Sequence, residues 1–307
     1  MRRTPSFDER VVASLHGLSL AEAKVARFFQ ENREEVMVAS ASALASKIGT
    51  SDATVIRATK TLGYAGLDEL RQQLAAELRL NLSPASRLAR TLGEVGDDAQ
   101  SAFGKTLDIH IKALDDLRRD VSPKLFQTAV DRLAGARRIV IFGIGPSSAI
   151  ADYFAIQLGR FGIEGHRLTQ TGLLLADGLH RLREGDLVVI LAYSRVYREL
   201  EALLDRARRL GLATILLTDT LGAALQKRVD LILPVERGRA DQLSMHTATL
   251  GLIEALLVGV AAKRPAETIA SLKSLNDLRA QLVGKAMNLP IPDPRTASVS
   301  KRPTRRR

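Results

Sequence analysis

A turn rich in glycine and serine could bind an anion. The segment GIGPSS (143–148) follows the short apolar run RIVIFG and precedes a helical pattern. Glycines let a ligand approach the backbone closely, and the start of a helix offers N–H groups and a favourable dipole to an anion. We therefore expect Gly143, Gly145, Ser147 and Ser148 to bind a ligand. The turn lacks the third glycine of a dinucleotide fingerprint, which argues against NAD.

A second loop could complete this site. The segment AYSRVY (192–197) ends another apolar run and brings a hydroxyl, Ser194, next to a cation, Arg195. A guanidinium fits phosphate and carboxylate equally well, so the ligand could be a sugar phosphate or a sugar acid. Tyr197 would narrow the entrance. Alternatively, Arg195 fills the site and leaves no room for a ligand, or pairs with Glu199 one helical turn further on.

Two weaker candidates follow later strands. Thr218-Asp219-Thr220 could close one side of the pocket, although a helix cap is the more economical interpretation. His246 could reach the pocket from its own or a neighbouring subunit, but a lone histidine is more often structural. No acid–base pair stands out and no spacing suits a metal. We therefore expect no catalytic residue, no metal site and no cofactor.

A helix-turn-helix pattern lies near the N-terminus, in SALASKIGTSDATVIRATKTL (42–62). Gly49 suits a tight turn between two helices, and Ser51 can cap the second. The face with Val55, Ile56, Thr59 and Leu62 is predicted to pack on the first helix. The opposite face would read DNA, since the N-terminal part of a recognition helix touches base edges. The residues predicted to contact DNA are Ser51, Asp52, Thr54, Arg57, Lys60 and Thr61.

Net charge alone gives weak support for DNA binding. Residues 1–80 hold eleven Lys/Arg against ten Asp/Glu, so the predicted DNA-binding domain is nearly neutral. Residues 295–307 hold six cations and no acid, which is more than half of the chain's net charge of +11. By spacing alone, the helix pair could equally be part of a plain solvated bundle. The basic tail could either add non-specific DNA affinity or only aid solubility.

The elements that would position these residues form two domains of different class. Residues before 80 show helical spacing, and a long helix is predicted over 97–119. Later, short apolar strands alternate with helices, which predicts a parallel sheet of about five strands with helices on both faces. The predicted strands are 138–143, 164–169, 186–193, 213–218 and 230–235. The predicted helices between and after them are 148–161, 171–182, 197–210, 242–262 and 266–282. The predicted divisions are 1–80 helix-turn-helix domain, 81–122 helical linker, 123–284 α/β effector domain and 285–307 disordered tail.

The N-terminal domain resembles that of the RpiR/MurR family of bacterial transcriptional regulators. The resemblance covers residues 18–80 and rests on LSLAEAKVARFFQENREEV, on the pair Leu44-Ala45, on the Ser51-to-Arg57 pattern and on LGYAG (62–66). It implies an all-α helix-turn-helix domain that binds double-stranded operator DNA.

Residues 137–265 resemble a SIS (sugar isomerase) domain, the effector module of the same family. The family's usual sugar-phosphate loop reads Ser-x-Ser-Gly-x-Thr. Here only Ser194 survives, because Ala192, Arg195 and Tyr197 replace the first serine, the glycine and the threonine. The departure puts a phosphosugar ligand in doubt but leaves an anionic ligand open.

These patterns favour a DNA-binding transcriptional regulator that is not an enzyme and that senses a small anionic, sugar-derived metabolite. We expect a homodimer or homotetramer in the cytoplasm, without membrane contact, since the chain has no cysteine and no long apolar run. Two alternatives stay open. The SIS domain could be only a dimerisation scaffold without a ligand, or the protein could be a phosphosugar isomerase.

Overall fold

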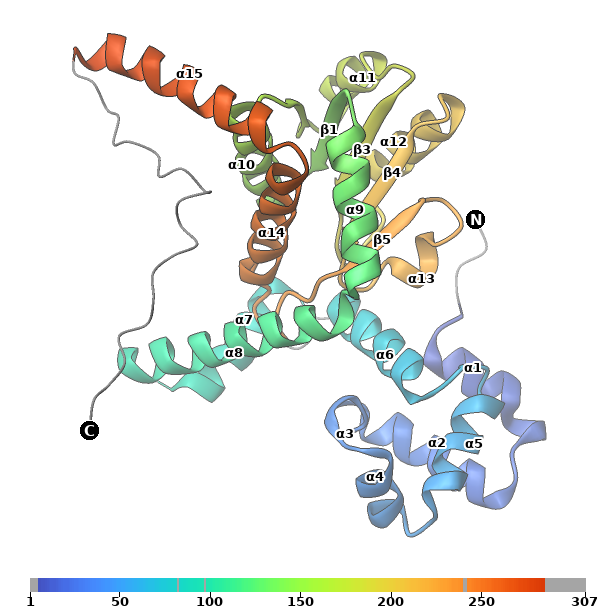
Figure 1. The fold of residues 1–307 in the computed structure, drawn as a ribbon. Coiled ribbons are helices and arrows are strands. Elements are labelled where there is room, and N and C mark those ends of the chain that lie inside the picture. The colour runs from blue at the N-terminus through green and yellow to red at the C-terminus, as the bar shows by residue number, and fades with distance from the viewer. Residues whose placement is uncertain (1–4, 82, 97, 240–241, 285–307) are drawn as a thin grey trace, which may run out of the picture.

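The computed structural model describes residues 5–81, 83–96, 98–239 and 242–284. Its N-terminal part is helical, and its remainder is a sheet covered by helices (Figure 1). The N-terminal helices are α1 (Phe7–Ser14), a short 3₁₀ helix (Leu15–Gly17), α2 (Leu20–Glu31), α3 (Arg33–Val38), α4 (Ala41–Ile48), α5 (Asp52–Thr61) and α6 (Leu67–Asn81).

Serine side chains begin several of these helices. Ser6 and Ser19 accept a hydrogen bond from the backbone of a glutamate three residues on, and that glutamate bonds back to the serine N–H. Ser40 and Ser51 cap α4 and α5 in the simpler way, with one bond to the backbone. Such caps satisfy N–H groups that have no partner inside the helix. The helices share one core, in which the fully buried side chains include Phe7, Phe29, Leu44, Val55 and Leu70.

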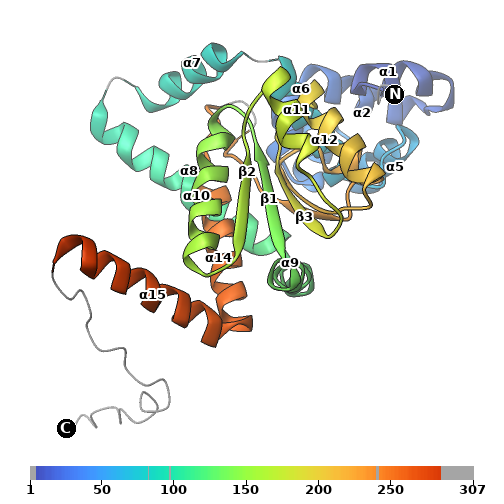
Figure 2. The same ribbon diagram turned by 90° about the horizontal axis from the view of Figure 1, so that it is seen from above.

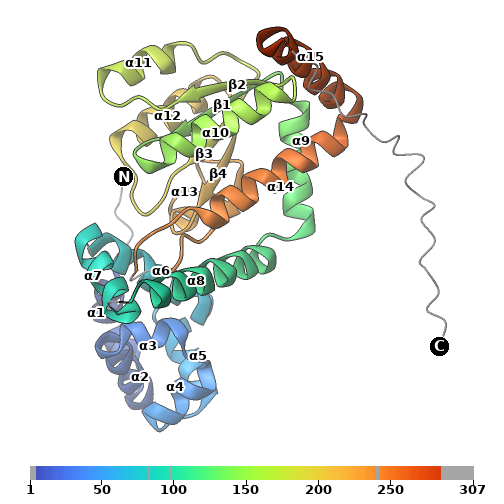
Figure 3. The same cartoon turned by 90° about the vertical axis from the view of Figure 1, so that its left-hand side faces the viewer.

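Two helices connect this domain to the sheet. They are α7 (Pro84–Val95) and α8 (Ala99–Asp120), and α8 is the long helix expected over 97–119. α8 runs beside the sheet domain (Figure 3) and packs against α14 (Thr247–Lys263). Its Ala113 is buried in the core of the sheet domain. α8 is therefore part of the α/β packing as well as a connection.

The sheet has five parallel strands in the order β2-β1-β3-β4-β5. They are β1 (Arg138–Gly143), β2 (Glu164–Leu168), β3 (Asp186–Leu191), β4 (Ala213–Thr218) and β5 (Leu231–Pro234). All five predicted strands are present, some one or two residues shorter than expected. The chain order reverses at β1, which lies between β2 and β3. In open parallel sheets, ligands bind beyond the carboxyl ends of the strands at such a reversal.

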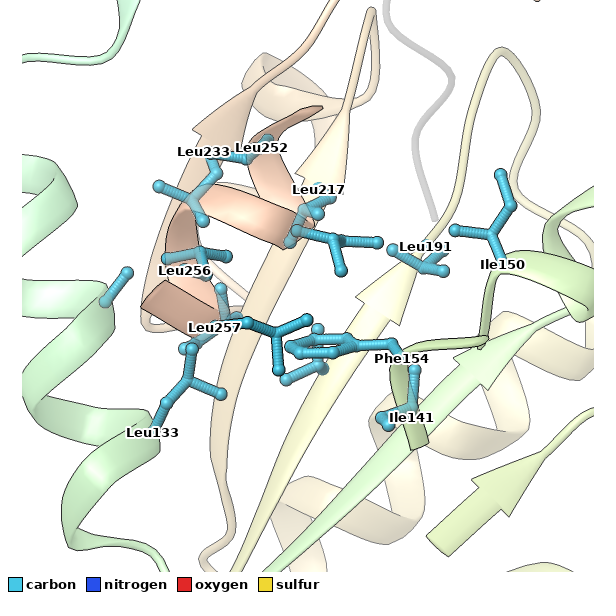
Figure 4. Close-up of a cluster of buried hydrophobic side chains, with 14 of the residues drawn as sticks. Leu133, Ile141, Ile150, Phe154, Leu191, Leu217, Leu233, Leu252, Leu256 and Leu257 are labelled. Carbon is cyan, nitrogen blue, oxygen red and sulfur yellow. The ribbon is translucent and has the colours of Figure 1, made fainter. Parts of the chain in front are cut away.

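Helices cover both faces of the sheet, as predicted (Figure 2). One face carries α9 (Pro123–Gly135), α10 (Pro146–Arg160) and α14, whose side chains Leu133, Phe154 and Leu256 meet those of the strands (Figure 4). The other face carries α11 (Leu173–His180), α12 (Arg198–Arg209) and α13 (Gly222–Leu225). The last described helix is α15 (Pro265–Val283).

One predicted helix start is wrong. The pattern placed a helix over 242–262, but α14 begins at Thr247. Residues 242–246 instead belong to the connection after β5, where the Met245 N–H donates to the Arg237 carbonyl at 3.1 Å. The helices α9 and α13 were not singled out from the sequence. Among the described residues, no helix is long and apolar enough to cross a membrane. The predicted basic tail lies outside the described residues.

Candidate functional site

The turn between α4 and α5 has the geometry that its sequence predicts. Gly49 takes a left-handed φ of +70°, and the next N–H, that of Thr50, donates to the Ala45 carbonyl at 2.9 Å. This arrangement ends α4 and satisfies its last carbonyls. The hydroxyl of Ser51 then accepts from the Thr54 N–H at 3.2 Å and so begins α5. The two helices are thus joined as in a helix-turn-helix unit.

The buried face of α5 is rotated slightly from its predicted position. Val55, Thr59 and Leu62 are fully buried as expected, but Ile56 is only half-buried. Thr54, which we placed on the solvent face, is instead buried, so that part of the prediction is wrong. Its hydroxyl lies 2.9 Å from the Ser51 hydroxyl in the helix cap, on the part of α5 that packs against α2 and α4.

The other residues predicted to contact DNA are exposed on one side of α5: Ser51, Asp52, Arg57, Lys60 and Thr61. Arg57 Nη2 donates to the Thr54 hydroxyl at 3.2 Å, and this bond holds the guanidinium close to the helix. The α4–α5 pair lies at the end of the molecule remote from the sheet (Figure 3). Because Thr54 is buried and accepts from Arg57, it can orient the Arg57 side chain but cannot itself contact a DNA base.

The glycine- and serine-rich turn follows β1 and opens α10, as expected. A Cβ on Gly143 would lie 2.5 Å from the Ser147 carbonyl oxygen, so only glycine fits there. Gly145 takes a φ of +59° and precedes the helix. Ser147 is buried in the first helical turn, and the Ser148 hydroxyl donates to the Gly145 carbonyl at 2.7 Å. The turn therefore holds the start of α10 close to the end of β1.

The second loop contains a strained residue. Ser194 has a φ of +61°, and it is the one non-glycine residue with positive φ in the described part of the chain. The Arg195 N–H donates to the Tyr193 carbonyl at 2.6 Å and closes a three-residue turn around Ser194. Left-handed backbone at a non-glycine residue costs roughly 1–2 kcal/mol and is often found at functional sites. Arg195 and Tyr197 are both exposed beside this turn.

A buried ion pair holds Ser194 in this conformation. The Asp219 carboxylate accepts from the Ser194 N–H at 3.1 Å and from the Arg237 Nε at 3.0 Å. Arg237 Nη2 also donates to the Ser194 hydroxyl at 2.7 Å. The side chains of Arg237 and Asp219 are 14% and 0% exposed. We refer to Ser194, Asp219 and Arg237, together with Tyr193, whose ring lies 4.3 Å from the guanidinium, as the Arg237 cluster.

A half-buried histidine adjoins the Arg237 cluster. The His246 ring packs edge-on against Tyr193 at 5.2 Å, and its Nδ1 lies 3.3 Å from the Thr249 hydroxyl, which also bonds Tyr193. Burial, reinforced by the positive charge of Arg237, lowers the pKa of His246 to about 4. Burial likewise raises the pKa of Tyr193. His246 thus reaches this region from within its own chain and is neutral at pH 7.

Strand order explains why these groups meet. The ends of β1 and β3 are paired, with Gly143 opposite Leu191, so the two predicted loops leave the sheet side by side. β4 and β5 follow on the same side of β3 and bring Asp219 and Arg237 to the same edge. In the segment after β4, the Thr218 hydroxyl caps the backbone at Leu221, as one interpretation predicted, and Asp219 joins the cluster. Closure of a ligand pocket by this segment stays a prediction.

The sequence analysis missed Arg237, Tyr193 and Thr249. A signal for Arg237 was present, because a cation directly follows the apolar run of the fifth strand, at the edge where the other loops meet. Geometry alone thus defines a helix-turn-helix domain joined to a doubly wound sheet, with a largely buried cation at the carboxyl edge of the sheet.

Comparison with known proteins agrees with this class. Residues 7–81 match the family model described as a helix-turn-helix domain of the rpiR family, and residues 132–259 match that of the SIS domain. The chain belongs to the RpiR family of transcriptional regulators, with a SIS domain after the helix-turn-helix domain.

Individual relatives share both domains. The chain is 29% identical over 264 residues to the HTH-type transcriptional regulator HexR of Pseudomonas aeruginosa, covering 83% of this chain and 89% of HexR. It is 32% identical over 273 residues to the bifunctional protein glk of Paraburkholderia xenovorans, covering 85% of this chain but only 42% of that longer protein. The fold matches that of Vibrio vulnificus NanR, solved in complex with ManNAc-6P, with a TM-score of 0.56, 21% identity and coverage of 90% and 99% of the two chains.

Proposed function

We propose that this regulator binds a two-fold operator through α5 and that its SIS domain senses a small anionic, sugar-derived metabolite. The ligand would lie beyond the ends of β1 and β3, and its binding would change the arrangement of paired DNA-binding domains in a homodimer or homotetramer. The proposed boundaries of the domains remain 1–80, 81–122 and 123–284.

The observation that carries the proposal is the Arg237 cluster. Burying a guanidinium and a carboxylate is costly, and such a pair adds little stability compared with apolar packing. A buried cation at the ligand-binding edge of the sheet, next to a helix N-terminus, is better explained as part of an anion site. NanR, whose fold matches, was solved with a sugar phosphate, which supports the same ligand class.

Ser147, Ser148, Ser194 and Arg195 are proposed to converge on one anionic group of the ligand. The pairing of β1 with β3 supports this convergence, because it places the two loops next to each other. Arg195 and Tyr197 are exposed, which suits residues at the entrance. Because two hydroxyls of the family's usual sugar-phosphate loop are absent here, a sugar acid fits this site as well as a sugar phosphate does.

On DNA, the exposed face of α5 is proposed to make the contacts. Arg57 suits a guanine edge or a phosphate, and Lys60 suits a phosphate. Ser51 and Thr61 are small enough to let the helix approach the groove. Asp52 lies at the start of α5, where its negative charge interacts favourably with the positive end of the helix dipole.

One observation favours the scaffold alternative. Arg237 already binds the Ser194 hydroxyl, so the site could be closed by its own side chains. An isomerase is less well supported, because isomerisation needs a base near the substrate and His246, with its pKa lowered to about 4, is a weak one at neutral pH.

A thermal-shift screen of sugar phosphates and sugar acids tests the proposal, repeated with operator DNA present. We expect at least one compound to stabilise the protein. If that compound weakens DNA binding, DNA must weaken its binding by the same factor. No stabilisation by any compound of either class would favour the scaffold alternative.

A further inference from the structure

The connection after β5 joins the Arg237 cluster to helix α7. Arg237 stands at its start, and within a few residues the connection docks on α7 through two side chains of that helix. Glu94 accepts from Arg239 Nη1 at 3.1 Å and from Gln242 Nε2 at 2.6 Å. The Leu243 N–H donates to the Thr91 hydroxyl at 3.0 Å. We call the described residues of this segment, 237–239 and 242–243, the β5 connection.

Helix α7 is in turn tied to the DNA-binding domain. Arg90, one residue before Thr91, forms an ion pair with Glu34 on α3. α3 packs against α6, and Arg71 on α6 donates to the Val36 carbonyl of α3 at 3.0 Å. Polar contacts therefore connect the ligand-binding edge of the sheet to α7, and α7 to the helix-turn-helix domain.

A cleft beside the β5 connection leaves room for this segment to move. A cleft of about 800 Å³ lies between α3, α6, α8 and the β5 connection, and its walls include Arg71, Lys112, Asp219 and Gly238. The Gln242 Oε1 is buried and has no hydrogen-bond partner among the described residues. A buried polar atom without a partner weakens the docked state, so release of this contact is less costly than that of a fully satisfied one.

We propose that the β5 connection acts as a lever: its displacement transmits the effect of ligand binding from the sheet domain to the DNA-binding domain. This inference rests on the proposed function. An anionic group bound beside Ser194 competes with Asp219 and Ser194 for the hydrogen bonds of Arg237. A shift of Arg237 displaces the β5 connection from Glu94 and Thr91. α7 then loses its anchor on the sheet domain, and through Arg90 and Glu34 the helix-turn-helix domain changes its position.

The test separates ligand binding from its transmission. Glu94→Gln keeps the shape of the side chain but removes the charge that binds Arg239, and Thr91→Val removes the hydroxyl that accepts from Leu243. Asp131→Asn, in a surface ion pair with Lys263 between α9 and α14, is the matched control. Inorganic phosphate, glucose 6-phosphate and gluconate serve as probes. Their binding is measured by calorimetry, and DNA affinity by fluorescence anisotropy on a fragment selected by the wild-type protein.

For the wild type and Asp131→Asn, we expect the bound probe to change DNA affinity by at least about fivefold, the lower end of typical couplings. Glu94→Gln and Thr91→Val should bind the probe within about twofold of wild type but lose most of that change. A full change in both variants would overturn the lever while the proposed function stands. If the probes that bind the wild type leave its DNA affinity unchanged, the result contradicts both the lever and the proposed sensing. If none of the probes binds, the proposed function fails together with the lever.

Arg237→Lys tests the sensing end. It keeps the charge but not the planar fork that bonds Asp219 and Ser194 together. We expect probe affinity to fall about tenfold or more, a loss of the size seen when a charge-assisted hydrogen bond is removed. Circular dichroism checks folding. Ser194→Ala, which removes only one acceptor of Arg237, provides a milder second variant whose probe affinity should also fall. Wild-type affinity in both would remove Arg237 from the site.

Discussion

The Nη2 of Arg237 lies 2.7 Å from the Oγ of Ser194, although the two residues are 43 positions apart. This contact places a buried guanidinium beside the one serine that the family's usual sugar-phosphate loop retains here. The neighbouring Arg195, which the sequence singled out as the cation of the site, is exposed. The carboxyl edge of the sheet thus carries two arginines, one bonded to Asp219 and one exposed.

Ser194 should be strained by its backbone conformation. We expect Ser194→Gly to be about 1 kcal/mol more stable than Ser194→Ala, since glycine adopts a φ of +61° without steric cost. Both variants lose the hydroxyl that Arg237 binds, so their difference reports the backbone alone. Urea unfolding of the two proteins measures it, and equal midpoints would show that the turn is not strained.

Arg57 should read the operator. Arg57→Ala is expected to weaken specific binding by about 1–3 kcal/mol if the guanidinium contacts a base edge. Titrations on operator and on random DNA distinguish the possible roles. Equal losses on both would assign Arg57 to a phosphate, and unchanged binding on both would remove it from the interface. Lys60→Ala, with a phosphate role expected, provides the comparison.

His246 should make stability depend on pH. Its folded-state pKa is lowered to about 4, while the unfolded value is about 6.5. The unfolded state therefore binds more protons between these values, so the contribution is complete above pH 6.5 and is lost as the pH falls towards 4. Wild type should lose roughly 1–2 kcal/mol more than His246→Asn between pH 7.5 and pH 5. Denaturant unfolding at both pH values measures this, and parallel losses would contradict it.

Arg195 should contribute to ligand affinity without supporting the fold. We expect Arg195→Ala to abolish ligand-induced thermal stabilisation, because a cation at the entrance would be lost from the anion site. Dimerisation and ligand-free DNA binding should stay as in wild type. Size-exclusion chromatography and DNA titration serve as controls. If the ligand stabilises Arg195→Ala as much as wild type, Arg195 does not contribute, and the ligand is recognised by Arg237 and the serines.

The basic tail should act on DNA through charge alone. Deletion of residues 295–307 removes six cations and is expected to flatten the salt dependence of DNA binding while operator preference is kept. Binding constants across a series of salt concentrations give the slope. A slope identical to that of the full chain would leave the tail without a role on DNA.

Local sequence patterns were enough to predict the types and order of the main elements. Apolar runs marked four of the five strands, whereas β2, with the mostly polar sequence EGHRL, gave a weaker signal. Gly49 with Ser51 marked the turn before α5, because helix capping, like strand burial, depends on residues only a few positions apart. The same short-range signals located the turn at Gly143 to Ser148. They also predicted that the turn and the Ser194 loop would leave the sheet at one edge, since both follow parallel strands.

Only the tertiary structure decided which side chains meet at that edge. Arg237 reaches Ser194 because β4 and β5 add to the sheet beside β3, and no local pattern contains that strand order. The late start of α14 has the same origin: residues with helical spacing, Gln242 and Leu243 among them, bind α7 instead. Burial of Thr54 likewise depends on how α5 packs on α2 and α4. Periodicity gives each element a buried face, but the rotation of that face and the partners of its polar groups are set by elements distant in sequence.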